Sequence, residues 1–129
     1  MIVQNLTSIE AYKLIQSIPT AILIDVRTNK EWQEEGVPLL NDQSNVLLLS
    51  WRQLPDMTHN HSFIQEILTT IHDDKTQLFF LCRSGTRSSE AANFVSNHGY
   101  LRCYNITDGF VGNLQEKGWK NNKLPWKML

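Results

Sequence analysis

The sequence predicts an α/β fold in which a parallel sheet carries helices on both faces. Four short segments have the length and composition of strands, namely 21–26, 46–49, 78–82 and 102–106. Segments with helical spacing of apolar residues alternate with them along the chain. A helical crossover returns the chain to the same end of a sheet, so strands that alternate with helices run parallel.

The composition describes an ordinary globular protein. The chain has 129 residues, 41% of them hydrophobic and 19% charged, with a net charge of −1. This length is sufficient for one domain, over residues 1–129, that buries a core without disulfides or metals. The sequence has neither a basic field for nucleic acid nor the pattern of a signal peptide or membrane span. We therefore expect a cytoplasmic protein whose partners include no nucleic acid and no membrane.

Local spacing marks the starts of the first two helices. Thr7 and Glu10 have the spacing of a capping box and predict a helix that ends before Pro19. Thr28 and Glu31 repeat this spacing directly after the first strand, which predicts a second, brief helix.

The same reasoning places the elements in the middle of the chain. The strand at 46–49 is followed by a polar loop at 56–60. The spacing of Ser62 and Gln65 predicts a capped helix with an apolar face. The helix that follows the strand at 78–82 has Gly99 as its predicted C′ residue.

The strand at 78–82 delivers a cysteine to the start of that helix. Gly85 can adopt a positive φ, so the loop at 83–87 can turn several N–H groups toward the Cys82 sulfur and form an anion-binding nest. The partial positive charge at the N-terminus of the following helix also stabilises negative charge on the sulfur, as do the charges of Arg83 and Arg87. We therefore expect the thiolate of Cys82 to be favoured over the thiol.

The length of the loop distinguishes between the types of reaction that such a thiolate could carry out. Phosphatases with a catalytic cysteine have five residues between the cysteine and the arginine, whereas four residues lie between Cys82 and Arg87. The shorter ring fits a single additional sulfur atom. A buried, inert cysteine is the alternative, but such a residue has no use for two arginines and a glycine around it.

Residues 82–87, Cys-Arg-Ser-Gly-Thr-Arg, resemble the six-residue active-site loop of the rhodanese family, thiosulfate sulfurtransferases that carry a persulfide on this cysteine. Residues 25–27 (Asp-Val-Arg) and 31–32 (Glu-Trp) are similar to a second motif of the family. Residues 36–38 (Gly-Val-Pro) lack the histidine of the family's Gly-His-Ile-Pro turn, as in a single-domain bacterial subgroup. The Gly-Phe, Gly-Trp and Leu-Pro-Trp segments between 109 and 126 resemble the family's closing pattern.

The resemblance implies a single rhodanese-like domain with a central, mainly parallel five-stranded sheet. It also implies a sulfurtransferase in which Cys82 takes sulfane sulfur from thiosulfate or a related donor, holds it as a persulfide and passes it to cyanide or a thiol. Arg83 is assigned to the substrate and Arg87 to bracing the loop. The substrate-binding loop comprises Arg83, Ser84, Gly85, Thr86, Arg87 and Ser88. No cofactor is implied, and the expected partners are a small-molecule donor and an acceptor, which includes a protein or low-molecular-weight thiol.

Several residues should meet Cys82 at one rim of the sheet. In parallel sheets ligands bind beyond the carboxyl ends of the strands. The residues that follow the predicted strands are Arg27, Trp51, Cys82 and Asp108. Trp51, Arg52 and Arg27 are thus candidate pocket walls. The alternatives are that Trp51 covers a strand end and that Arg27, with Asp25, ties a strand end to neighbouring loops.

Two other functional classes stay open. A cysteine-dependent phosphatase or arsenate reductase would use the same thiolate, and a non-catalytic rhodanese-like binding module would use the fold without the chemistry. No metal is expected, because His59 and His61 have no third ligand at suitable spacing.

The two cysteines are not expected to form a disulfide. Cys82 closes one strand and Cys103 opens the next, and parallel strands place these positions at opposite ends of the sheet. The two Cα atoms should therefore lie on the order of 15 Å apart. A disulfide spans at most about 7 Å between Cα atoms.

Overall fold

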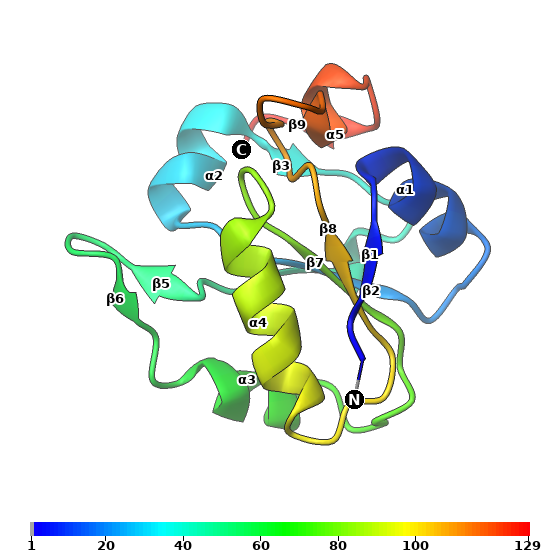
Figure 1. Ribbon diagram of the computed structural model, residues 1–129, viewed down its shortest axis with the longest axis vertical. Helices are drawn as coiled ribbons and strands as arrows, with labels where there is room; N and C mark the ends of the chain where they lie inside the picture. The colour runs from blue at the N-terminus through cyan, green and yellow to red at the C-terminus, as the bar shows by residue number, and fades with distance from the viewer. Residues whose placement is uncertain (1) are drawn as a thin grey trace.

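The computed structural model describes residues 2–129, and a five-stranded sheet forms its centre. The strand order is β1-β8-β7-β2-β4, and every neighbouring pair is parallel (Figure 1). The strands are β1 (Gln4–Leu6), β2 (Ile22–Asp25), β4 (Val46–Leu48), β7 (Leu78–Leu81) and β8 (Cys103–Ile106). The predicted α/β class with a parallel five-stranded sheet is confirmed.

Helices cover both faces of this sheet. Helices α1 (Ser8–Gln16) and α5 (Gly118–Asn121) pack on one face, and α3 (Phe63–Thr70) and α4 (Thr86–Ser96) pack on the other. Helix α2 (Asn29–Glu35) lies beside the carboxyl ends of the strands (Figure 1). None of the helices among residues 2–129 has the length and apolar character needed to span a membrane.

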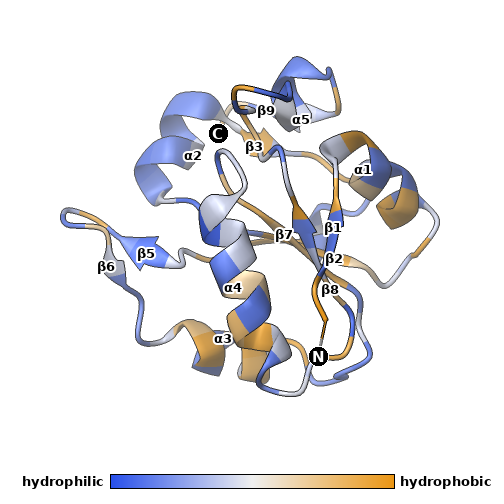
Figure 2. Ribbon diagram, in the orientation of Figure 1, coloured by the Kyte–Doolittle hydropathy of each residue, from blue (hydrophilic) through white to orange (hydrophobic). Residues whose placement is uncertain are grey.

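The central strand β7 serves both cores because successive side chains point to opposite faces. Leu78 and Phe80 join the core under α3 and α4, whereas Phe79 and Leu81 join the core under α1 and α5. All four side chains are buried, as expected for a parallel strand covered on both sides. Figure 2 shows α2 in hydrophilic colours, in contrast to the hydrophobic colours of β7.

Two small antiparallel pairs of strands lie outside the central sheet. Strand β3 (Val37–Pro38) pairs with β9 (Trp126–Lys127), which ties the C-terminal segment to the chain after α2. Strands β5 (Arg52–Gln53) and β6 (Thr58–His59) form a hairpin. This hairpin projects from the body of the molecule (Figure 1), and the polar loop predicted at 56–60 forms its tip and second strand. A 3-10 turn at Gln43–Asn45 precedes β4.

The structure contains two of the helix caps that the sequence predicts and lacks the third. The capping boxes at Thr7 and Thr28 are both formed. Ser62 does precede α3, but its side chain makes no capping hydrogen bond. The Asn60 side-chain oxygen instead accepts a hydrogen bond from the Ser62 N–H at 3.1 Å, so the turn before the helix is closed by another residue.

Two further details differ from the sequence-based expectation. Helix α4 ends at Ser96 with Asn97 as its C-cap, so Gly99 occupies the C″ position and not C′. Strand β1 was not anticipated, because Gln4-Asn5-Leu6 contains one apolar residue. This segment is a strand because it pairs with β8 at the sheet edge.

Candidate active site

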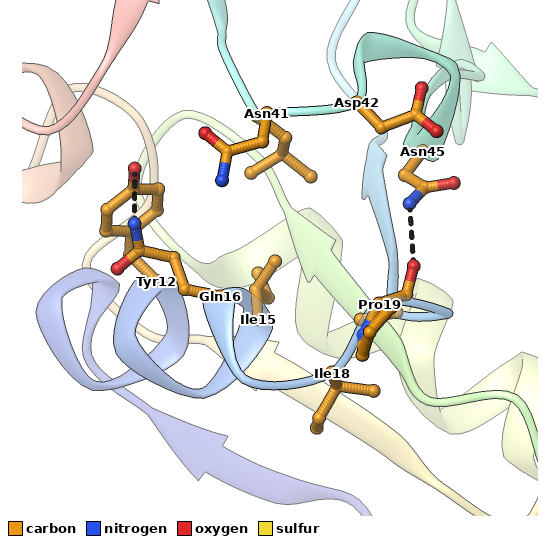
Figure 3. A pocket seen from close by; sticks show the side chains of 10 residues that line it. Tyr12, Ile15, Gln16, Ile18, Pro19, Asn41, Asp42 and Asn45 are labelled. Atoms are coloured by element: carbon orange, nitrogen blue, oxygen red, sulfur yellow. Dashed lines mark hydrogen bonds between the residues drawn. The ribbon is translucent and has the colours of Figure 1, made fainter.

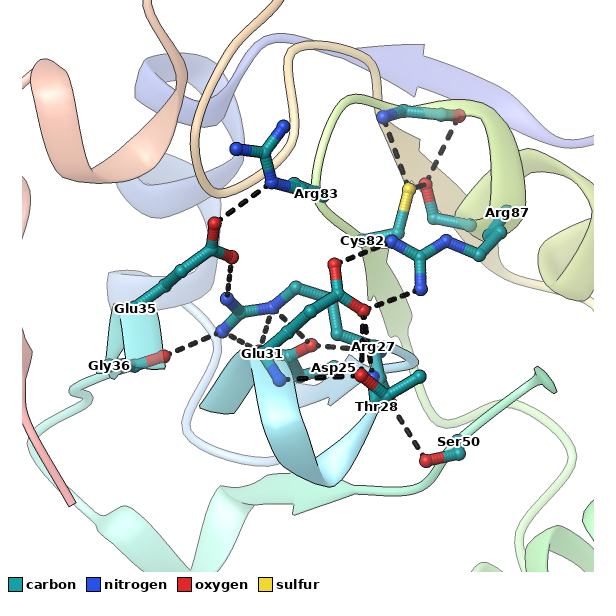
Figure 4. Close-up of polar contacts among 12 residues, drawn as sticks. Asp25, Arg27, Thr28, Glu31, Glu35, Gly36, Ser50, Cys82, Arg83 and Arg87 are labelled. Atoms are coloured by element: carbon teal, nitrogen blue, oxygen red, sulfur yellow. Dashed lines mark hydrogen bonds and ion pairs between the residues drawn. The ribbon is translucent and has the colours of Figure 1, made fainter. Parts of the chain in front are cut away.

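Cys82 is the first residue after β7, and its side chain points to the same face as Phe80. The residue is 1% exposed. The Gly85 N–H donates a hydrogen bond to the Cys82 sulfur at 3.1 Å, and Ser88 Oγ lies 3.2 Å from the same sulfur. Figure 4 shows the sulfur inside the turn that leads into α4. The strand end and the first turn of the helix thus hold the sulfur in a fixed position.

The turn of the loop requires glycine at position 85. Gly85 has a φ of +110° and is the N-cap of α4. A Cβ atom at this position would lie 2.1 Å from the Thr107 carbonyl oxygen. The loop is therefore packed backbone against backbone on the segment that follows β8.

Further contacts hold the loop against that segment. The Phe110 N–H donates to the Cys82 carbonyl at 2.8 Å, and the Val111 N–H donates to the Arg83 carbonyl at 3.0 Å. A Cβ at Gly109, which also has a positive φ, would lie 2.3 Å from the Arg83 carbonyl oxygen. The side chains of Ser84 and Thr86 are not constrained in this way, and both residues are exposed.

Arg87 connects the loop to α2. Its two terminal nitrogens donate to the two carboxylate oxygens of Glu31 at 2.7 and 2.8 Å (Figure 4). Burial acts to raise the pKa of Glu31, but the hydrogen bonds from Arg87 and Thr28 prevail and lower it to about 2. The same pair raises the pKa of Arg87. A bidentate pair of this kind fixes orientation as well as charge.

Arg83 is placed differently. Its Nε donates to Glu35 at 2.9 Å, and its side chain is 50% exposed. Within residues 2–129 the two terminal nitrogens of Arg83 have no hydrogen-bond partner. Arg83 and Arg87 both line an open pocket of about 390 Å³, whose other walls come from α2 and from Leu54 and Met57 in the hairpin.

The chain matches the STR4 middle domain family over residues 4–129. It belongs to this family. Among relatives of this STR4 middle domain protein, an uncharacterized protein of Rickettsia conorii, RC0915, is 50% identical over 127 residues, which cover 98% of this chain and 99% of the relative.

Solved structures extend the comparison for this member of the STR4 middle domain family. Rv0390 from M. tuberculosis is 34% identical and superposes with a TM-score of 0.86, covering all of both chains. A polysulfide-sulfur transferase homodimer from Wolinella succinogenes is 21% identical with a TM-score of 0.68, covering 97% of this chain and 78% of that one. A rhodanese-like domain from Anabaena sp. is 12% identical with a TM-score of 0.68, covering 100% and 81%. The chain therefore has the rhodanese-like fold.

The structure corrects the proposed pocket wall at Arg27. This residue is completely buried. Its guanidinium pairs with Asp25 at 2.8 Å, donates to the Gly36 carbonyl at 2.8 Å and lies 4.1 Å from the centre of the Phe110 ring. A guanidinium that is completely buried, paired and hydrogen-bonded within the protein is not accessible to a ligand, so Arg27 is a structural residue.

Trp51 and Arg52 do not line the pocket beside the loop either. The Trp51 ring is 6% exposed and packs in the core against Phe63, and its indole N–H donates to Glu90 at 3.1 Å. Arg52 follows in β5 and lies 3.9 Å from Glu90. Both residues connect the hairpin to α4 through Glu90, and neither lines the pocket that Arg83 lines.

Sequence reasoning did not assign roles to Glu35 or Asn105. Glu35 binds Arg83 and also lies 3.3 Å from Arg27, so it connects the loop to the buried arginine. Asn105 Oδ1 accepts from Ser88 Oγ at 2.6 Å. The sequence feature that could have indicated a role for Asn105 is the presence of a polar side chain inside the apolar strand at 102–106.

Cys103 lies at the opposite end of the sheet from Cys82. It pairs in register with Leu78, the first residue of the strand that Cys82 follows. Both cysteines are free thiols, and burial raises the pKa of the Cys103 thiol to about 12. The predicted parallel arrangement is confirmed, and Cys103 has the character of a small buried hydrophobic residue.

A second pocket, of about 320 Å³, lies at the amino ends of β2 and β4 (Figure 3). Tyr12 and Ile15 form part of one side, and Asn41, Asp42 and Asn45 form part of the other. This pocket lies at the end of the sheet opposite to Cys82. Among residues 2–129, no group of three or more histidine, cysteine or acidic side chains is arranged to hold a metal ion.

Proposed function

We propose that this protein is a sulfurtransferase that moves sulfane sulfur from thiosulfate, or a related donor, to cyanide or a thiol through a persulfide on Cys82. The observation that carries the proposal is the position of the Cys82 sulfur, which accepts the Gly85 N–H at 3.1 Å inside a six-residue loop. The rhodanese-like fold and its likeness to a polysulfide-sulfur transferase support this reaction class.

The reaction proceeds in two displacements. The Cys82 thiolate attacks the outer sulfur of thiosulfate, the sulfur–sulfur bond of the donor breaks, and sulfite leaves with the bonding electrons. The Gly85 N–H, which donates to the Cys82 sulfur at 3.1 Å, stabilises negative charge at this position. Cyanide then attacks that sulfur, the persulfide bond breaks and thiocyanate leaves, which regenerates the thiolate. With a thiol acceptor the product is the acceptor's persulfide.

Arg83 is the residue best placed to bind an anionic donor. Arg83 lines an open pocket, and its terminal nitrogens have no hydrogen-bond partner among residues 2–129, whereas both terminal nitrogens of Arg87 are engaged by Glu31. Arg83 therefore binds the sulfonate end of the donor, and Arg87 holds the loop in the conformation that receives it.

The first experiment compares thiosulfate with cyanide against p-nitrophenyl phosphate as substrates. The wild-type protein should form thiocyanate, and Cys82→Ser should form none while retaining the wild-type melting temperature, because serine has no accessible anion near neutral pH. Mass spectrometry should show one added sulfur atom on the Cys82 peptide after thiosulfate treatment. Phosphate release without thiocyanate would indicate a phosphatase, and the absence of both products would indicate a non-catalytic binding module.

A further inference from the structure

A buried hydrogen-bond chain runs from the Cys82 sulfur into the sheet. The sulfur lies 3.2 Å from Ser88 Oγ in the first turn of α4, and Ser88 Oγ lies 2.6 Å from Asn105 Oδ1 in β8. Ser88 is completely buried, and Asn105 is 4% exposed. Because the chain is shielded from water, each of its members must find its hydrogen-bond partner within the protein.

The neighbours of Asn105 determine which way its amide faces. Asn105 Nδ2 lies 3.3 Å from the Gly85 carbonyl oxygen, which can only accept a hydrogen bond. The amide nitrogen therefore faces Gly85, and Oδ1 is the atom that faces Ser88. An amide oxygen can also only accept, so Ser88 must be the donor in the 2.6 Å contact.

Ser88 Oγ also lies 3.2 Å from the Gly85 carbonyl oxygen, which can only accept. The contact with Asn105 Oδ1 is the shorter one at 2.6 Å, so the single hydroxyl proton of Ser88 is donated mainly to Asn105. While the proton is donated to Asn105, a lone pair of Ser88 Oγ faces the sulfur. A lone pair accepts the S–H of a Cys82 thiol but repels a thiolate. To stabilise the thiolate, the hydroxyl must rotate toward the sulfur and give up the bond to Asn105.

We propose that Asn105 is a positioning residue that sets the balance between thiol and thiolate at Cys82 through the Ser88 hydroxyl. Asn105 favours the thiol, and the Gly85 N–H at 3.1 Å favours the thiolate. Since the thiolate is the nucleophile, Asn105 restrains the reactivity of Cys82. The inference rests on the proposed function, in which Cys82 is the attacking group.

The charged groups around the sulfur are engaged in pairs, and substitutions at Ser88 or Asn105 leave these pairs in place. The pairs are Arg87 with Glu31, Arg83 with Glu35 and Arg27 with Asp25. A change in Cys82 reactivity in Ser88 or Asn105 variants therefore reports on the hydroxyl and not on a rearranged charge.

The test measures the rate of Cys82 alkylation by iodoacetamide, a neutral reagent, between pH 5 and pH 9. Peptide mass spectrometry separates Cys82 from Cys103. Asn105→Leu removes the closer of the two oxygen acceptors of the Ser88 hydroxyl, so the sulfur then competes only with the Gly85 carbonyl oxygen at 3.2 Å. The rate at low pH should rise by about three- to tenfold, the range expected for one hydrogen bond. Ser88→Ala removes the lone pair that accepts the thiol S–H and repels the thiolate, so its rate should not fall below that of the wild type. Asn105→Ala repeats the test in case leucine prevents folding.

The double variant is decisive because Asn105 is proposed to act through Ser88. In the Ser88→Ala background, Asn105→Leu should leave the alkylation rate unchanged. Ser96→Ala is the matched control, since Ser96 is a buried serine of the same helix about 12 Å further along it, and its rate should equal that of the wild type. An equal effect of Asn105→Leu in both backgrounds, or no effect in either, would overturn the inference.

Alkylation does not require sulfur transfer, so the two proposals can fail separately. The expected alkylation pattern without thiocyanate formation would refute the proposed function and leave the role of Asn105 standing. Thiocyanate formation without the expected alkylation pattern would support the proposed function and refute the role of Asn105.

Discussion

Arg83 and Arg87 lie four residues apart in one loop, yet their guanidinium groups have different surroundings. Arg87 makes a bidentate pair with Glu31 in a partly buried position, whereas Arg83 shares one nitrogen with Glu35 and is half exposed. An exposed pair contributes about 0–1 kcal/mol to folding. Removing one member of a buried pair costs far more, because the other charge is left without a partner. The two arginines should therefore respond differently to substitution.

Arg83→Ala should raise the KM for thiosulfate several-fold and change the melting temperature little. The physical reason is that its terminal nitrogens are available to the substrate and its ion pair is exposed. Steady-state kinetics and thermal unfolding measure the two effects. Lys13→Ala is the control, because Lys13 is an exposed cation on α1 that does not line this pocket. Unchanged KM in Arg83→Ala would show that the donor is bound elsewhere.

Glu31→Gln should lower the free energy of unfolding at pH 7 by on the order of 2–3 kcal/mol. The pKa of Glu31 is about 2 in the folded protein and 4.5 in its reference state, so its contribution is present above pH 4.5 and is lost as the pH falls toward 2. Denaturant unfolding should show the difference between wild type and variant shrinking from pH 5 to pH 2. Glu34→Gln, on the same helix without an ion pair, should show no such dependence. A pH-independent difference for Glu31→Gln would contradict the prediction.

At the scale of elements, the loop at 82–87 is supported by the backbone of the segment after β8 as well as by the pair of Arg87 with Glu31. Gly85 and Gly109 allow the two backbones to approach, and N–H groups of residues 110 and 111 hold the carbonyls of residues 82 and 83. The position of the sulfur thus depends on two strand ends that lie more than twenty residues apart in the sequence.

Gly85→Ala should reduce both stability and sulfur transfer, since its Cβ would meet the Thr107 carbonyl oxygen at 2.1 Å. Gly99→Ala is a matched control: Gly99 also has a positive φ, of +100°, but a Cβ there meets nothing within 4 Å. The control should lose about 1 kcal/mol from backbone strain and retain activity. Equal losses of stability and activity in the two variants would show that the close contact at position 85 is unimportant.

At the scale of the whole molecule, the parallel sheet separates the two cysteines. Cys82 follows the carboxyl end of β7, and Cys103 begins β8 beside the amino end of β7. Non-reducing peptide mapping of folded, mildly oxidised protein should therefore find no peptide that links residues 82 and 103. Guanidinium-unfolded protein oxidised in parallel is the control, since the unfolded chain allows the two thiols to meet. A linked peptide in good yield from the folded protein would contradict the prediction.

The sequence by itself determined those features that depend on neighbouring residues. The strand at 78–82, the loop around Gly85 and the capping boxes at Thr7 and Thr28 follow from hydrophobicity, backbone freedom and hydrogen bonds over three or four residues. The order of strands and helices then implied the parallel sheet and the shared rim.

Only the tertiary structure decided which side chains meet at that rim. Arg27, Trp51 and Arg52 follow strand ends as Cys82 does, but the first two are buried and the third faces Glu90. Glu31, Glu35 and Asn105 reach the loop from elements whose distance and rotation the sequence does not specify. A strand end determines the rim at which a residue lies, whereas packing between elements determines where its side chain points, and that packing depends on contacts between residues far apart in the chain.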